Sequence, residues 1–251
     1  MTSLISDAAG LPAPSRHWAL FLDFDGTIAE IAEAPHLVAL DPEMIPILRG
    51  VVAELAGAVA VITGRTIADL DSFMAPLTMA AAGIHGLERR LPGENAVTRL
   101  DPPRIDAVKS RLAAFAAARP GVVFEDKGPA ATLHYRQAPA AENDILALVA
   151  SLCQGLDGYH VMHGKCVVEI KSDMADKGSA IEALMQYAPF RGRRPVFIGD
   201  DITDEDGFRV VNTMGGFGVK VGNGNSAAGY AVKDVQTVHE WLRMMPGLLA
   251  E

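Results

Sequence analysis

The sequence has few cysteines and no long hydrophobic run. Only two of its 251 residues are cysteines, Cys153 and Cys166, and neither belongs to a CxxC pair or lies near a metal-like cluster of ligands. We therefore expect two buried, unpaired thiols in a reducing compartment. No Lys or Arg precedes Arg16, no secretory signal pattern is visible, and no apolar stretch is long enough to cross a bilayer. These absences predict a soluble cytoplasmic protein.

The sequence also has fewer basic than acidic residues. The chain has 22 Lys and Arg residues against 31 Asp and Glu residues, which gives a formal net charge of -9. Such a chain is poorly suited to nucleic acid or to an anionic membrane, so neither is expected as a partner. An anionic small substrate remains compatible with this charge, because one bound metal ion inverts the local sign. The absence of a GxxxxGK[ST] string argues against an NTPase.

What is present is the pattern of a compact α/β protein. Hydrophobic residues make up 49% of the chain and charged residues 21%, which suits one large or two modest domains. Short apolar runs at 18–22, 58–62 and 196–198 predict parallel strands that are buried on both faces. Between the first two runs, residues 41–56 have helical spacing, with Asp41 as the expected N-cap and a proline after it. The same pattern returns after about residue 175, with helices expected at 176–187 and 203–211 and a strand at 216–223.

The middle of the chain has a different pattern. It predicts a helix that begins at Asp101, strands at 122–127 and 131–136, a second helix at 138–158 and a hairpin at 159–171. This order indicates an α+β segment with an antiparallel sheet. We interpret it as a domain, 101–173, inserted into a core formed by 1–100 and 174–251.

Three of the predicted strands end abruptly in polar residues. These are Asp23 and Asp25 after the first strand, Thr63, Gly64 and Arg65 after the second, and Asp200 and Asp201 after the third. Ligands of open parallel sheets bind at the carboxyl ends of the strands, so we expect these residues to line one crevice. Neighbouring carboxylates repel one another and are costly to desolvate, so a cation has to compensate them. A hard-oxygen site of this kind suits Mg²⁺, which takes few carboxylates together with waters and phosphate oxygens.

Some acids near the third strand have a second interpretation. The stretch GDDITDED, 199–206, holds five carboxylates in eight residues. Thr203 can cap the following helix, and Asp204 and the two acids after it favour the dipole of its first turn. That interpretation leaves Asp200 and Asp201 unexplained.

Other candidates keep two interpretations each. Lys177 begins a predicted helix, where it gains nothing from the dipole, and is either a solvated surface residue or a phosphate ligand. Thr63 offers a hydroxyl donor. Arg65 either binds an anion or pairs with a nearby acid. His85 is either a core residue or a substrate contact.

Alternation along the strands of the middle segment predicts one polar face and one apolar face. The polar candidates are Glu125, Lys127, Thr132, His134, Arg136, Glu169 and Lys171. The alternating apolar residues would pack against the two helices. The polar face is either solvated, as in many antiparallel sheets, or closes over the core and hydrogen-bonds the hydroxyl groups of a sugar.

Four strings, in this order, resemble the four motifs of the haloacid dehalogenase (HAD) superfamily: DFDGT (23–27), the turn at 63–65, Lys177 and GDD (199–201). The second aspartate, Asp25, is similar to that of the phosphatases and phosphomutases rather than the dehalogenases. GDDITDEDGF (199–208), GIHG (83–86), LHYR (133–136) and VEIK (168–171) resemble the trehalose-6-phosphate phosphatase family within it. The resemblance covers the core, about 1–100 and 174–251, and is looser in the middle.

The resemblance implies a fold and an activity. The fold is a Rossmann-like α/β core, a parallel sheet flanked by helices, with an inserted α+β cap of the C2 type. The activity is a Mg²⁺-dependent hydrolysis of trehalose 6-phosphate to trehalose and phosphate through an aspartyl-phosphate. A small sugar phosphate is thus the expected partner, while association with a trehalose-phosphate synthase, and a monomer or a weak oligomer, are left open.

The resemblance also assigns roles to residues. Asp23 would attack phosphorus, Asp25 would donate and then accept a proton, and Thr63 and Lys177 would bind the phosphoryl oxygens. The metal set implied is the Asp23 carboxylate, the Asp25 main-chain carbonyl and Asp200, with Asp201 or Asp204 acting through water or behind the ligands. The substrate set implied is Gly64, Arg65, His85, Glu125, Lys127, His134, Arg136, Glu169 and Lys171.

Other functions stay open at this point. Within the same chemistry they are a sucrose-phosphate or mannosyl-phosphoglycerate phosphatase, or a phosphomannomutase. From another class, a catalytically silent sugar-phosphate sensor would lack part of the acid set, and here Asp23, Asp25, Lys177 and Asp200 are all present.

Overall fold

The structure, a computed structural model, describes residues 5–6, 10–32 and 37–250 and forms two compact units. The core unit comprises Met1–Ala32, Val38–Arg99 and Asp176–Glu251, and the inserted unit comprises Glu33–Leu37 and Leu100–Ala175. None of the helices in the described part of the chain combines the length and the hydropathy needed to cross a membrane.

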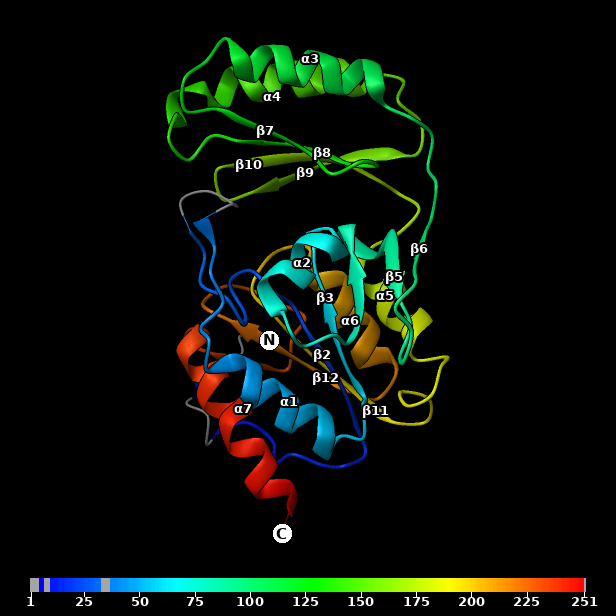
Figure 1. Cartoon of the computed structure of the whole chain (residues 1–251). Helices are drawn as coiled ribbons and strands as arrows, with labels where there is room; N and C mark the ends of the chain where they lie inside the picture. The colour runs from blue at the N-terminus through cyan, green and yellow to red at the C-terminus, as the bar shows by residue number, and fades with distance from the viewer. Residues whose placement is uncertain (1–4, 7–9, 33–36, 251) are drawn as a thin grey trace. The chain divides into compact units, whose positions relative to one another are not determined.

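The core unit is built on a mixed sheet that has nine strands among the described residues (Figure 1). Their order is β1-β13-β12-β11-β2-β3-β4-β5-β6, and all neighbours are parallel except the antiparallel pairs β4–β5 and β5–β6. The strands are β1 Ile5–Ser6, β2 Trp18–Leu22, β3 Val59–Ile62, β4 Ala80–Gly83, β5 Glu88–Arg90, β6 Val97–Arg99, β11 Arg194–Gly199, β12 Phe217–Val221 and β13 Tyr230–Val232. The predicted α/β class is confirmed, and the antiparallel edge of β5 and β6 is an addition to it.

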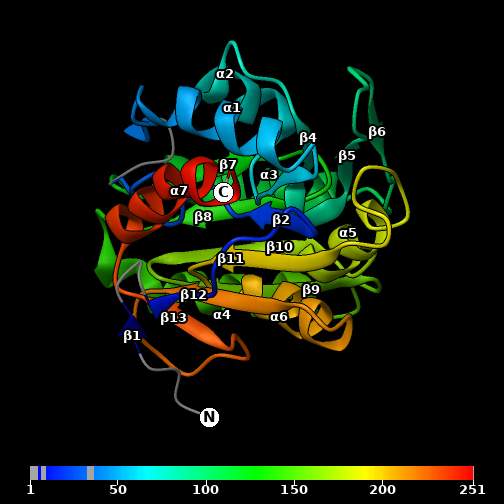
Figure 2. The same cartoon turned by 90° about the horizontal axis from the view of Figure 1, so that it is seen from below.

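The central strands are apolar because helices cover both faces of the sheet. Every residue of β2 and β3 is buried. Figure 2 shows α1 (Met44–Glu54), α2 (Ile67–Met74) and α7 (Val235–Ala250) on one face, with α5 (Lys177–Leu184) and α6 (Asp204–Thr213) on the other. Burial on both faces explains why these strands are continuous hydrophobic runs rather than alternating ones.

One helix of the core begins later than predicted. α1 starts at Met44 rather than at residue 41, because Asp41 caps a turn that precedes it. The Asp41 Oδ1 atom accepts a hydrogen bond from the Glu43 main-chain N–H at 2.9 Å. An Asx turn of this kind competes locally with the helix.

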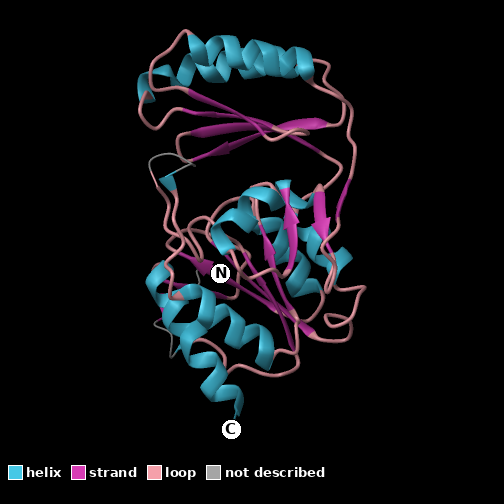
Figure 3. Ribbon diagram, in the orientation of Figure 1, coloured by secondary structure: helices cyan, strands magenta, loops and turns pink. Residues whose placement is uncertain are grey.

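The inserted unit is an antiparallel sheet in the order β7-β8-β10-β9, with helices α3 and α4 packed on one face (Figure 3). Its elements are α3 Asp106–Ala117, β7 Val123–Asp126, β8 Ala131–His134, α4 Glu142–Cys153, β9 Tyr159–Gly164 and β10 Val167–Ser172. Leu133, Tyr135, Val168 and Ile170 lie in its hydrophobic core, as the alternation predicted.

Two details of the inserted unit differ from the prediction. Asp101 is not a helix N-cap, because Pro102 and Pro103 follow it and disfavour helical conformation in the residues before them. The helix begins at Asp106 instead. Cys153 and Cys166 are free, as expected, but they are half-buried rather than buried.

Candidate active site

The strand register of the core unit brings the predicted strand-end residues together. Leu22 pairs with Ile198 in β11 and with Val61 in β3, so the three strands end at the same edge. The main-chain N–H of Asp23 donates to the Ile198 carbonyl at 2.9 Å, which continues the ladder past the end of β2. Asp23 is therefore fixed at the carboxyl end of the sheet by backbone pairing.

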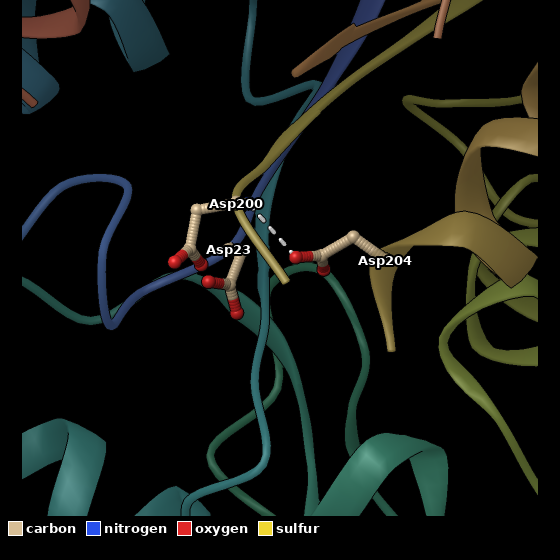
Figure 4. A group of neighbouring side chains, drawn as sticks. All are labelled: Asp23, Asp200 and Asp204. Atoms are coloured by element: carbon tan, nitrogen blue, oxygen red, sulfur yellow. Dashed lines mark hydrogen bonds between the residues drawn. The ribbon is translucent and has the colours of Figure 1, made fainter. Parts of the chain in front are cut away.

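Three carboxylates meet at this edge. Asp23, Asp200 and Asp204, which we call the carboxylate cluster, offer oxygen atoms that all lie within 4.8 Å of one another. Figure 4 shows the three side chains side by side, with Asp23 from just after β2, Asp200 from just after β11 and Asp204 from the start of α6. Asp23 and Asp204 are buried and Asp200 is half-buried. Asp201 is exposed and lies outside this group, so its role at a metal remains a prediction.

Lys177 is the cation of the cluster. Its ammonium donates to Asp23 Oδ1 at 2.7 Å and to Asp204 Oδ1 at 2.6 Å. The side chain is held there by the start of α5, where Asp176 and Ser179 form a capping box. With 2% of its surface exposed, Lys177 is not the solvated surface residue that one interpretation predicted. Burial alone would lower its pKa, but Asp204 and Asp23 outweigh that effect and raise the pKa above its usual range.

Asp204 organises the turn between β11 and α6. Its Oδ2 atom accepts hydrogen bonds from the main-chain N–H groups of Asp200 and Asp201, each at 2.9 Å. Its Oδ1 atom accepts a hydrogen bond from the Lys177 ammonium. Thr203 stands at the N-cap position without a side-chain cap, so the interpretation of Thr203 as a capping residue is wrong. These contacts place Asp204 behind the site, where it shapes the turn that carries Asp200.

The electrostatics of the cluster indicate that negative charge is under-compensated. Burial, together with the charges of Asp204 and Asp200, raises the pKa of Asp23 well above its ordinary value despite the nearby Lys177. Burial and the charge of Asp204 raise the pKa of Asp200 to about 7. A divalent cation among these oxygens would favour the ionised forms and lower both pKa values. Carboxylate oxygens are the protein ligands that Mg²⁺ prefers, and each of the three acids offers one here.

Two residues of the DFDGT string have structural roles that the sequence analysis did not identify. Gly26 has a φ of 79°, and a Cβ there would lie 2.2 Å from Asp200 Oδ2, so a larger residue would displace the Asp200 carboxylate. Thr27 is buried and its hydroxyl donates to Asp23 Oδ2 at 3.3 Å. With Lys177 on Oδ1, both oxygens of Asp23 are held.

Lys220 was also missed. It lies in β12, is 9% exposed, and its ammonium donates to the main-chain carbonyls of Asp200 and Val221. A lysine in the apolar string FGVKV was the available signal, since a buried lysine needs a polar partner. It supports the chain at Asp200 from the neighbouring strand.

The turn after β3 carries the predicted residues Thr63, Gly64 and Arg65, and the predicted His85 packs against it. Thr63 is buried, and its carbonyl accepts from the main-chain N–H of His85 at 3.0 Å. His85 is 5% exposed and has a φ of 53°. A Cβ on Gly64 would lie 2.8 Å from its ring, so the imidazole packs directly on this turn. Arg65 pairs with Asp25, which decides between its two interpretations in favour of the nearby acid.

The inserted unit gathers four of the predicted polar residues. The His134 ring nitrogen lies 2.8 Å from Glu125 Oε2, and the Lys127 ammonium donates to Glu169 Oε1 at 3.3 Å. We call Glu125, Lys127, His134 and Glu169 the inserted-unit cluster. Burial would raise the pKa of Glu125, but His134 and Lys127 together lower it. The neighbours of Glu125 therefore favour its ionised form.

The remaining polar candidates of the inserted unit divide into two kinds. Thr132 pairs with Glu125 and Glu169 across the sheet and is buried on the same face. Lys171 is buried in β10. Arg136 is exposed, because β8 ends at His134 and the alternation does not continue to it.

Comparison with known proteins agrees with this geometry. The family model described as trehalose-phosphatase matches residues 21–236. The chain belongs to the trehalose-phosphatase family. Trehalose-6-phosphate phosphatase of Escherichia coli strain K12 is 40% identical over 241 residues, which are 96% of this chain and 91% of that protein. Membership of this family makes the chain a phosphatase.

Solved structures agree on the fold of this trehalose-phosphatase family member. The C-terminal domain of C. albicans trehalose-6-phosphate phosphatase has a TM-score of 0.82 at 21% identity, covering 92% of this chain and 93% of that one. A Bacteroides thetaiotaomicron phosphatase of the HAD superfamily has a TM-score of 0.62 at 16% identity, covering 96% and 99%. These likenesses confirm the predicted HAD fold with a cap.

Proposed function

We propose that this chain is a Mg²⁺-dependent phosphatase that hydrolyses trehalose 6-phosphate to trehalose and inorganic phosphate, by way of an aspartyl-phosphate on Asp23. The observation that carries the proposal is the meeting of Asp23 with Lys177 and Asp200 at the carboxyl edge of the sheet. The 40% identity with the E. coli enzyme supports the choice of substrate.

The first step is a transfer of the phosphoryl group. A carboxylate oxygen of Asp23 forms a bond to phosphorus, and the bond from phosphorus to the sugar oxygen breaks. The electron pair of that bond goes to the sugar oxygen, which takes a proton from Asp25. Thr27 and Lys177 hold the two oxygens of Asp23 at 3.3 and 2.7 Å, and this restricts the orientation of the attacking group.

The second step returns the enzyme to its starting state. Asp25 takes a proton from a water molecule whose oxygen attacks phosphorus. The bond between phosphorus and Asp23 then breaks, and its electron pair returns to the carboxylate. In the proposed mechanism, Thr63 and Lys177 contact phosphoryl oxygens in both steps and stabilise the negative charge of each transition state.

The metal would be held by the chain's own oxygen atoms. The Asp23 carboxylate, the Asp25 main-chain carbonyl and Asp200 are the ligands we propose, with Asp201 acting through water and Asp204 holding the turn. Mg²⁺, when bound, neutralises these acids and the charge of the phosphate.

Selection of the sugar is assigned to the inserted unit. Glu125, Lys127, His134 and Glu169 present charged donors and acceptors on one face of its sheet, a set suited to sugar hydroxyls. Lys171 and Arg136 remain predicted members of this set, as do Gly64 and His85 on the core side. The proposal also includes a cytoplasmic location, for which the two free thiols argue.

Phosphate release from a panel of sugar phosphates tests the function. The panel holds trehalose 6-phosphate, sucrose 6-phosphate, mannose 6-phosphate and glucose 6-phosphate, each at several concentrations to give kcat/KM. We expect trehalose 6-phosphate to be preferred, with Asp23→Asn protein as the control for contaminating phosphatases. Preference for a monosaccharide phosphate would contradict the substrate assignment.

A further inference from the structure

Arg65 forms a bidentate salt bridge with Asp25. The guanidinium Nε donates to Asp25 Oδ2 at 2.7 Å and Nη2 donates to Oδ1 at 2.6 Å. This bidentate fork fixes the plane of the carboxylate as well as its distance. The Arg65 side chain is 11% exposed, whereas that of Asp25 is 36% exposed. The Asp25 carboxylate is thus open to solvent on one side and bound by Arg65 on the other.

Aromatic side chains hold the Arg65 guanidinium in place. The Arg65 guanidinium carbon lies 4.8 Å from the centre of the Phe73 ring and 5.7 Å from that of Phe24. Cations favour such positions near aromatic rings. The two rings also contact each other, with centroids 5.5 Å apart, and Phe24 is fully buried. The guanidinium is therefore braced by side chains of the core.

The backbone of Arg65 is fixed too. Its N–H donates to Thr63 Oγ1 at 3.1 Å, and its carbonyl accepts from Ile84 at 2.8 Å. The turn that carries Thr63 therefore also carries the group that holds Asp25. Because both the backbone and the guanidinium of Arg65 are held, its side chain loses little conformational entropy when it binds Asp25.

Simple stabilisation explains this arrangement poorly. Ion pairs that reach solvent contribute little to the free energy of unfolding. Here two aromatic contacts and two hydrogen-bond donors of Arg65 hold an acid that is partly exposed. A bidentate anion at the same edge of the guanidinium is disfavoured as well, because Nε and Nη2 already donate to a carboxylate.

We propose that Arg65 is a positioning residue for the proton transfers of Asp25, which rests on the phosphatase function proposed above. The fork holds the carboxyl group so that its proton reaches the sugar oxygen as the bond to phosphorus breaks, and so that it later receives the proton of the attacking water. Arg65 keeps its own protons throughout. Loss of the fork harms release of the sugar and not binding of the phosphate.

Two substrates with different leaving groups test the proposal. A sugar alkoxide needs a proton as it leaves, whereas p-nitrophenolate does not. In Arg65→Met we expect kcat for trehalose 6-phosphate to fall by about 10- to 100-fold, the size of effect that follows a misplacement near 1 Å. We expect KM, and inhibition by inorganic phosphate, to change by less than about threefold, because a positioning residue does not alter ground-state binding. The rate of the p-nitrophenol burst from p-nitrophenyl phosphate, which reports the first step alone, should stay within the same factor.

A double-variant cycle with Asp25→Asn sharpens the result. Once Asp25 has lost its carboxylate, Arg65→Met should produce no further loss, because the two residues act as a unit. Arg65→Lys keeps the charge without the fork, should also lower kcat, and serves as the readout if Arg65→Met does not fold, as judged by thermal melting.

Three outcomes would overturn the proposal. A rise in KM and in the phosphate inhibition constant at constant kcat would make Arg65 a phosphate ligand. Equal losses with both substrates, additive with Asp25→Asn, would make its role structural. Full activity of Asp25→Asn on trehalose 6-phosphate would remove the proton transfers that Arg65 serves, whereas absence of wild-type turnover with that sugar phosphate alone would point to the function proposed above.

Discussion

The two charged clusters of this protein solve the problem of buried acids in opposite ways. In the carboxylate cluster of the core unit, burial and mutual repulsion raise the pKa values of Asp23 and Asp200, and the nearby Lys177 and Lys220 do not offset them. In the inserted-unit cluster, burial would raise the pKa of Glu125, but the hydrogen bond from His134 and the charge of Lys127 outweigh burial and lower it.

Under the proposed function, this difference separates a site that would take an external cation from a set of groups whose partners lie within its own sheet. Buried acids without enough positive charge around them lower the stability of the folded state. Such groups, with perturbed pKa values, cluster at functional sites. We infer that the core cluster serves chemistry at a metal, while the inserted-unit cluster serves recognition. The predictions that follow probe this division.

The largest effect is expected from Asp23. The Asp23→Asn variant removes the attacking oxygen and should lower phosphate release by on the order of 10⁴- to 10⁶-fold. The exposed Asp157→Asn is the matched control and should retain full activity. Retention of turnover by Asp23→Asn, measured with both proteins folded by circular dichroism, would show that another group attacks phosphorus.

A smaller and different effect is expected from the inserted-unit cluster. In Glu169→Gln, kcat/KM for trehalose 6-phosphate should fall by about 10- to 100-fold, mainly through KM, since a hydrogen bond to a charged group contributes roughly 1.5–3 kcal/mol. Turnover of p-nitrophenyl phosphate, which has no sugar, should be unchanged. The exposed Glu240→Gln serves as the matched control. If Glu169→Gln changes the melting temperature and leaves KM as it was, the polar face is structural.

The pH dependence of stability tests the electrostatics of the carboxylate cluster. The folded-state pKa of Asp200, about 7, lies above its ordinary 3.8, so the folded protein holds a proton that the unfolded chain has released. The stability from this group is complete below the ordinary value and is lost as the pH rises through about 7. In EDTA-treated protein, the melting temperature should therefore fall by several °C between pH 5 and pH 8.

The Asp200→Asn variant is the control for that experiment. It should lose much of this slope and should be more stable than the wild type at pH 8 without metal, because one repelling charge is gone. Identical slopes for the two proteins would contradict the assignment of the pH dependence to the carboxylate cluster.

The smallest effect is expected from Thr27. The Thr27→Val variant keeps the shape of the buried side chain but removes its hydrogen bond to Asp23. A neutral hydrogen bond contributes roughly 0.5–1.5 kcal/mol, so kcat should fall by about 2- to 10-fold with KM unchanged. Steady-state kinetics at saturating substrate measure it, and unchanged kcat would mean that Lys177 alone orients the carboxylate.

The sequence predicted the main features of the core because they depend on local patterns. Strands buried on both faces are short apolar runs, and polar residues just after them collect at one edge of the sheet. Asp23, Thr63 and Asp200 could be placed in this way. The starts of α1 and α3 were misplaced, because Asp41 and Pro102 define local conformations that helical periodicity does not reveal.

Features that depend on partners far along the chain were not predicted. The pairing of Arg65 with Asp25 was one of two alternatives, and the sequence contains nothing that decides between them. Lys220 contacts a main-chain carbonyl of Asp200 in a neighbouring strand, and Thr27 contacts a carboxylate whose rotamer depends on Lys177. Such contacts follow from tertiary packing, which local sequence patterns do not reveal.

Magnesium dependence of turnover tests the central claim most directly. The enzyme is stripped with EDTA, transferred to metal-free buffer and assayed for phosphate release from trehalose 6-phosphate as Mg²⁺ is added. If the carboxylate cluster requires an external cation, the stripped enzyme is inactive, Mg²⁺ restores full turnover in a saturable way, and Asp200→Asn needs far more Mg²⁺. Turnover that is unaffected by chelation would contradict the account.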